Sequence, residues 1–138
     1  MRKAPLFIRI ISYFFIFMGI VAIGTLGVAG SNPSETQKMS VSFLTNSFSY
    51  NQNPTLFAAT CLLFVFAGIT GLAIVFRRSY AYDLGIVYCV CSLVFFTTLI
   101  ILRVGLINHP AISITIQFLL FGGFLAYLIR NRSKWKNA

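Results

Sequence analysis

The stretch FAGITGLAIVFRRSYAYDLGIVYCV, residues 66–90, decides the fold of this chain. Apolar residues lead up to Arg77 and Arg78, and an apolar run resumes around Asp83. A connection this short forces the two runs that it joins into antiparallel contact. The stretch therefore predicts a hairpin of two apolar helices.

Similar apolar runs extend along most of the 138-residue chain, in which hydrophobic residues make up 58% and charged residues 9%. An ordinary soluble domain has about 25% charged residues. Each run is near the roughly 20 residues that carry a helix across about 30 Å of hydrocarbon, and is too uniformly apolar for a barrel strand. The sequence predicts an all-α membrane protein, an up-down bundle of four transmembrane helices in a single domain. The predicted spans are residues 6–30, 54–76, 82–107 and 112–129.

Basic residues are distributed unevenly between the two sides of this four-span model. Lys38 and Arg103 lie on one side, and the other nine of the 11 Lys and Arg residues lie on the opposite side, among them Arg77, Arg78 and those of the tail, residues 130–138. By the positive-inside rule both termini are cytoplasmic. Topology and attraction to the anionic headgroups of the lipid bilayer explain the net charge of +9, so no nucleic-acid partner is expected. Small size and charge bias favour a bacterial inner membrane.

The first run also shares features with a cleavable signal peptide, because MRK precedes it and the small residues GVAG come before Ser31. Its apolar stretch exceeds the usual 7 to 15 residues of such peptides, so we expect an uncleaved span. Cleavage would leave three spans, with the outer loop as the new N-terminus.

The outer loop, residues 31–53, is the one sizeable polar segment. Asn32 as N-cap, Pro33 as first helical residue and Glu35 as third make a good helix start, and apolar residues up to Phe48 recur at helical spacing. We therefore predict a short helix on the membrane surface. Because Ser and Thr dominate from Ser40 onward and Val41 and Phe43 also fit alternation, a disordered or partly extended loop is the alternative. The candidate interaction residues of the loop are Glu35, Phe43 and Phe48.

Small residues are expected where helices meet, because helices in lipid associate through close packing rather than through the hydrophobic effect. We interpret them as internal packing residues, with a dimer contact as the alternative. The predicted packing residues are Gly24, Gly27, Ala67, Gly71, Gly122 and Ala126.

Titratable groups are too few and too far apart for a catalytic site. The two acidic residues, Glu35 and Asp83, lie on opposite sides of the membrane in this model, which excludes a carboxylate pair within one subunit. Cys61 lies near the outer edge, whereas Cys89 and Cys91 lie near the inner edge and point to nearly opposite faces of one helix. No catalytic residue, cofactor or metal site is predicted.

Two polar groups within the apolar runs are candidates for a specific role. Arg103 lies about one turn inside the third span, at a depth similar to that of Gln117 in the fourth. We predict that Arg103 bonds Gln117 or faces a cavity that takes an anion; the alternative is an arginine that extends to the headgroups. Asp83 is expected to cap the third helix and to pair with Arg9 or with a partner subunit.

These features favour a non-catalytic structural, accessory or assembly subunit of a larger membrane complex, whose partners are other membrane proteins or further copies of itself. The alternative is a small oligomeric channel, transporter or holin-like pore. The polar residues of the spans are too sparse to support a conducting path well. An enzyme acting on lipid or quinone is the least favoured class, because the chain lacks acid–base pairs.

Overall fold

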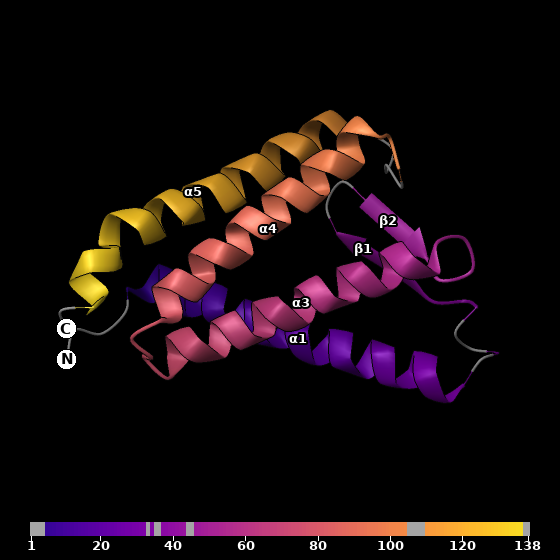
Figure 1. Cartoon of the computed structure of the whole chain (residues 1–138), viewed down its shortest axis with the longest axis horizontal. Helices are drawn as coiled ribbons and strands as arrows, with labels where there is room; N and C mark the ends of the chain where they lie inside the picture. Colours follow the sequence, from indigo (N-terminus) through magenta and orange to yellow (C-terminus); the bar gives the residue numbers. More distant parts are fainter. Residues whose placement is uncertain (1–4, 33, 35–36, 44–45, 105–109, 137–138) are drawn as a thin grey trace.

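The fold comes from a computed structural model, which describes residues 5–32, 34, 37–43, 46–104 and 110–136 (Figure 1). Its long helices are α1 (Leu6–Ser31), α3 (Pro54–Val75), α4 (Ala81–Ile101) and α5 (Pro110–Lys136). Two short strands, β1 (Ser40–Phe43) and β2 (Asn46–Ser49), lie between α1 and α3. All four helices are long and apolar enough to cross a membrane, which confirms a multi-pass helical membrane protein.

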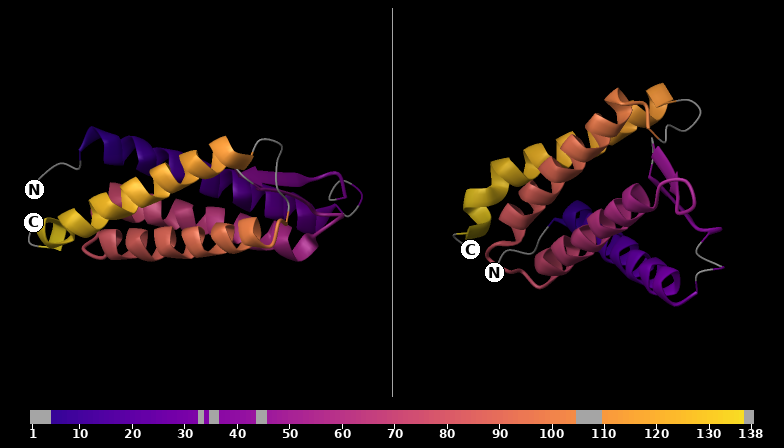
Figure 2. Two further views of the ribbon diagram at one scale, coloured as in Figure 1. Left: turned by 90° about the horizontal axis from the view of Figure 1, so that it is seen from above. Right: turned by 45° about the vertical axis from the view of Figure 1, so that its right-hand side comes forward.

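Successive helices run in opposite directions, as the short connections predicted (Figure 1). The most extensive packing is between α1 and α3, followed by α4 with α5, and α3 also contacts α4. The two helix pairs are close together where α1 begins and α5 ends, which we call the termini end. They diverge toward the opposite end, where β1 and β2 lie, which we call the hairpin end (Figures 1 and 2).

The first two spans match their predicted limits, and the other two do not. The third was predicted to continue to residue 107, but α4 ends at Ile101. Arg103 follows with a φ of 54°, its amide donates to the Ile100 carbonyl, and the Val104 amide donates to the Leu99 carbonyl. This pair of hydrogen bonds is a Schellman motif, which closes the helix by satisfying its last carbonyls.

The fourth span was predicted to give way to a basic tail after residue 129, but α5 continues as a helix to Lys136. The predicted limit at residue 129 is that of the apolar run, and the helix extends beyond it through the basic residues. Arg and Lys have good helix propensity, and basic side chains near a helix C-terminus interact favourably with its dipole.

The predicted surface helix of the outer loop is also wrong over residues 40–49, where the chain forms an antiparallel β-hairpin. Val41 pairs with Phe48 across the strands, and the Ser42 and Ser47 hydroxyls form a hydrogen bond of 2.9 Å. Serine and β-branched residues suit a pleated strand better than a helix. The extended alternative is thus confirmed here, while most of the helix start proposed at residues 32–35 lies outside the described residues.

Glycine brings α1 and α3 together. A Cβ added to Gly19 would lie 2.7 Å from the Gly68 Cα, and one added to Gly71 would lie 2.5 Å from the Ser12 carbonyl oxygen. Real Cβ atoms do not come this close to backbone atoms, so only glycine allows the two helices to approach this far. Ala67, one turn before Gly71, is buried in the same contact region.

Candidate functional site

A cluster of polar and aromatic groups lies at the termini end, where the last turns of α5 reach the turn between α3 and α4. The Trp135 Nε1 donates a hydrogen bond of 2.9 Å to the Arg78 carbonyl. The Trp135 ring also stacks on Tyr82, with ring centroids 4.6 Å apart and planes inclined by 9°. Trp135 therefore holds the end of α5 against both the α3–α4 turn and the first turn of α4.

An ion pair between Asp83 and Arg132 adds to this contact. Asp83 lies in the first turn of α4, where a negative charge interacts favourably with the positive end of the helix dipole. The α4 N-cap is Tyr80, and no side-chain hydrogen bond caps the helix, so the predicted capping role of Asp83 is not observed. The continuation of α5 brings Arg132 to the carboxylate, a partner that was not predicted from the sequence. The two paired side chains are 31% and 53% exposed, so this pair alone contributes little stability.

Arg77 and Arg78 lie exposed in the α3–α4 turn beside this cluster. Arg77 has a φ of 52°, and the amides of Arg77 and Arg78 donate to the carbonyls of Ile74 and Ala73. These bonds form a second Schellman motif, which ends α3. Their predicted role in membrane topology stays a prediction.

At the hairpin end, the described polar contacts are structural. Phe48 is 1% exposed and packs in a cluster with residues of α1, α3 and α4. The Asn46 Nδ2 donates a hydrogen bond of 2.8 Å to the Val104 carbonyl and so ties β2 to the turn after α4. Two other candidates cannot be assigned contacts, because Glu35 and the Phe43 side chain lie outside the described residues.

Arg103 and Gln117 occupy different environments from those predicted. Arg103 lies beyond the end of α4 with an exposed side chain, whereas Gln117 is buried in α5. The placement of Arg103 one turn inside the span is wrong, because α4 stops two residues before it. Without that placement, the predicted Arg103–Gln117 hydrogen bond has no support in the structure.

The predicted packing residues divide into two groups. Ala67 and Gly71 lie in the α1–α3 contact. In contrast, no described atom lies within 4 Å of a Cβ added to Gly24, Gly27 or Gly122, and Ala126 is exposed. The described residues give these four positions no close internal neighbour, and the alternative of a dimer contact stays a prediction. Sequence reasoning did not pair Gly19 with Gly68, since the small residues on the two helices gave no indication of register.

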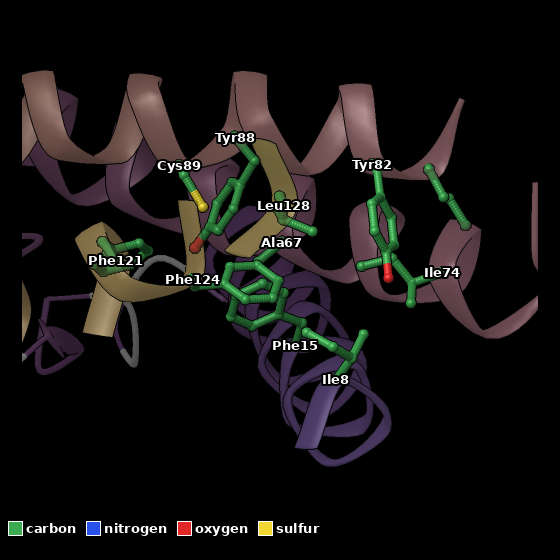
Figure 3. Close-up of a cluster of buried hydrophobic side chains, with 12 residues drawn as sticks. Ile8, Phe15, Ala67, Ile74, Tyr82, Tyr88, Cys89, Phe121, Phe124 and Leu128 are labelled. Carbon is green, nitrogen blue, oxygen red and sulfur yellow. The ribbon is translucent and has the colours of Figure 1, made fainter. Parts of the chain in front are cut away.

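Aromatic rings from all four helices fill the middle of the bundle. The Phe15 ring of α1 makes edge contacts with Tyr88 of α4 at 5.2 Å and with Phe124 of α5 at 5.6 Å. Phe66 of α3 contacts Tyr88 in the same way at 5.6 Å. Figure 3 shows Tyr88 pointing from α4 toward Phe121 and Phe124. Edge-to-face geometry is favourable for such rings, so they form a stable junction between the two helix pairs.

Beside this junction lies an apolar cavity of about 160 Å³, lined by residues from all four helices. Phe15 and Met18 of α1, Tyr88 of α4 and Phe124 of α5 are among them. Two other lining residues, Phe14 of α1 and Leu120 of α5, are 53% and 51% exposed. The cavity therefore opens sideways between α1 and α5.

Other groups that could bear chemistry are dispersed. Cys61 and Cys89 are buried free thiols, and Cys91 is an exposed one. Among the described residues, no three His, Cys, Asp or Glu side chains lie close enough together to hold a metal ion. No protein-family model, curated protein or solved structure matches the chain.

Proposed function

We propose that this protein is a non-catalytic structural or accessory subunit of a larger membrane complex, which contacts its neighbour through the outward face of α1. The observation that carries the proposal is the position of Gly24 and Gly27. These glycines are three residues apart and so lie on neighbouring parts of one helix face. No described atom lies within 4 Å of a Cβ added to either glycine. Exposed glycine lets a helix of another chain approach closely in lipid.

The interior of the bundle supports a structural role better than a conducting one. Two buried hydroxyls donate to carbonyls of their own helices: Ser12 to the Ile8 carbonyl at 2.7 Å, and Thr70 to the Phe66 carbonyl at 2.9 Å. Such hydroxyls are already satisfied and do not need a water-filled path. Apolar and aromatic side chains make up the buried cluster where the helix pairs meet, so a single chain provides little polar lining for an ion.

We place the protein in a bacterial inner membrane, with the termini end in the cytoplasm. The distribution of charge among the described residues supports this orientation. Arg77 and Arg78 lie at the termini end together with Arg130 and Arg132, whereas Arg103 follows the opposite end of α4. A greater number of Lys and Arg residues marks the cytoplasmic side of a membrane protein.

The test is purification of the tagged native protein in mild detergent, followed by identification of the proteins that copurify. We expect a defined larger complex, which Gly27→Leu removes because the larger side chain holds the neighbouring helix away. Val94→Leu is the matched control, since it enlarges an exposed side chain on α4, away from the α1 face that carries Gly24 and Gly27. A clean homo-oligomer that conducts ions in liposomes would instead support the pore. A monomer that retains no partner would contradict the proposal.

A further inference from the structure

The cavity between α1 and α5 has the size and lining of a site for a hydrocarbon chain. Its volume of about 160 Å³ is close to that of an apolar cavity of about 150 Å³ that stays dry and takes benzene. Tyr88 supplies the one polar side-chain atom among the lining residues, whereas an ordered water needs two to four polar partners. A transmembrane helix is far too wide, because packed helices lie about 8–10 Å apart. A thin apolar chain is therefore the occupant that fits.

The position of the cavity identifies the part of the chain that it would hold. Leu120 lies ten residues after Pro110, where α5 begins, or about 15 Å along the helix. Fifteen ångströms is about half of the hydrocarbon thickness, so the opening beside Leu120 lies near the middle of the bilayer. The ends of lipid chains meet at this depth, and the exposed side chains of Leu120 and Phe14 leave the opening accessible from the bilayer.

A basic residue, Lys134, lies on the same side of α5 as Leu120 and at the depth of the lipid headgroups. Leu120, Tyr127 and Lys134 are spaced by seven residues, which is nearly two helical turns each time. Lys134 is exposed and lies 14 residues, or about 21 Å, beyond Leu120. The headgroup region extends from about 15 Å to about 20–22 Å from the bilayer centre. A phospholipid whose chain ends beside Leu120 would therefore have its phosphate near Lys134.

We propose that the cavity binds the end of one hydrocarbon chain of an anionic phospholipid from the leaflet at the termini end, with the lipid phosphate at Lys134. The site uses the α1–α5 side of the molecule and a different face of α1 from Gly24 and Gly27. It does not depend on the proposed function as a subunit.

The test is native mass spectrometry of the full-length protein in detergent with added phosphatidylglycerol or with phosphatidylcholine of the same chains. We expect one retained phosphatidylglycerol, which Leu120→Trp reduces about tenfold by blocking the opening. Leu119→Trp is the matched control, because Leu119 is 71% exposed and does not line the cavity. If the tryptophan variant does not fold, Leu120→Phe is a smaller change that should also lower the retention of phosphatidylglycerol.

The headgroup part of the proposal has its own pair of variants. Lys134→Gln should lower the preference for phosphatidylglycerol over phosphatidylcholine about fivefold, the usual effect of one basic residue near an anionic headgroup. Arg9→Gln should leave the preference unchanged, because Arg9 is nine residues before Met18 and so lies on the opposite face of α1. Equal retention by the Leu119 and Leu120 variants would overturn the proposal, as would equal retention of the two lipids by the native protein.

Discussion

Arg77 and Arg103 occupy equivalent positions, because each is the left-handed residue that ends a transmembrane helix. Their φ angles are 52° and 54°. Glycine is the usual residue here, since an L-residue in this conformation costs roughly 1–2 kcal/mol. Both positions instead carry a cation at the negative end of a helix dipole, which offsets part of that cost. The exposed side chain of Arg103 can then extend to headgroups.

This geometry predicts an order of stability for three substitutions of Arg103. Arg103→Gly should be about 1 kcal/mol more stable to unfolding than Arg103→Ala, because both lack the guanidinium but only alanine retains the strained Cβ. Arg103→Val should be the least stable of the three, since a β-branched residue is poorly tolerated at positive φ. Thermal unfolding in detergent measures the order. Equal stability of the glycine and alanine variants would contradict the role of Arg103 in the Schellman motif.

The glycines show where sequence reasoning at the residue scale succeeds and where it does not. Small residues were correctly expected between α1 and α3, and Ala67 and Gly71 are found there. Gly24 and Gly27 are equally small residues of an apolar run, but they lie on the outward face of α1. Gly19, in contrast, contacts Gly68. The face of a uniformly apolar helix that packs against its neighbour depends on helix rotation. In lipid, no change of polarity around the helix reveals that rotation.

The β1–β2 hairpin was the least predictable element, because its sequence fits two periodicities. Val41 and Phe48 could follow one another on a helix face or pair across two strands. Burial decides between them: Asn46 and Phe48 alternate with less buried residues and pack against the hairpin end of the bundle. A short strand pair is marginal alone, so it depends on the packing of Phe48 and on the hydrogen bond from Asn46 to the Val104 carbonyl.

Phe48→Ala should therefore release the hairpin from the bundle. Loss of a buried phenylalanine costs about 3 kcal/mol or more, which corresponds to roughly a hundredfold rise in the open population. The rate of limited proteolysis between α1 and α3 should rise by a similar factor, because cleavage tracks the population of the open state when opening and closing are fast. Ser42→Ala is the control, since it removes only the exposed hydrogen bond to Ser47. Similar cleavage rates for the two variants would show that Phe48 does not hold the hairpin.

The continuation of α5 provides a direct optical test, because Trp135 is the single tryptophan of the chain. Tyr82→Ala removes its stacking partner, so the Trp135 emission should move to longer wavelength as water reaches the indole. Tyr80→Ala, a change in an exposed ring nearby, should leave the emission unchanged. Asp83→Asn should have only a small effect, because an exposed ion pair is worth about 0–1 kcal/mol. Unchanged emission in Tyr82→Ala would contradict the stacking.

At the scale of the whole molecule, the four helices and their order followed from the apolar runs alone. Their lateral arrangement did not, because the opening between α1 and α5 depends on the angle at which the two helix pairs meet. That angle is set by contacts such as those of Phe15 with Tyr88 and Phe124. Aromatic residues occur throughout the spans, so the sequence does not show which of them form the junction.

The proposed orientation predicts which segments reagents reach from outside the cell. In a variant whose three native cysteines are replaced, Ser42→Cys in β1 should react with a membrane-impermeant maleimide added to intact cells. Ser79→Cys, in the α3–α4 turn, should react only after permeabilisation. As a control, both introduced cysteines should be fully labelled in detergent, which shows that the protein itself does not shield them. The reverse pattern would place the termini outside, against the charge distribution.

The hydrogen bond from Trp135 to the Arg78 carbonyl also has a consequence for biosynthesis. It joins residues 57 positions apart, and its donor lies in the last turn of the last helix. The α1–α3 pair can associate while later segments are still on the ribosome, since chains begin to fold from the N-terminus. The α3–α4 turn acquires its tryptophan only after α5 has been synthesised. Until then, the turn is open to a chaperone, an insertase or an assembly partner.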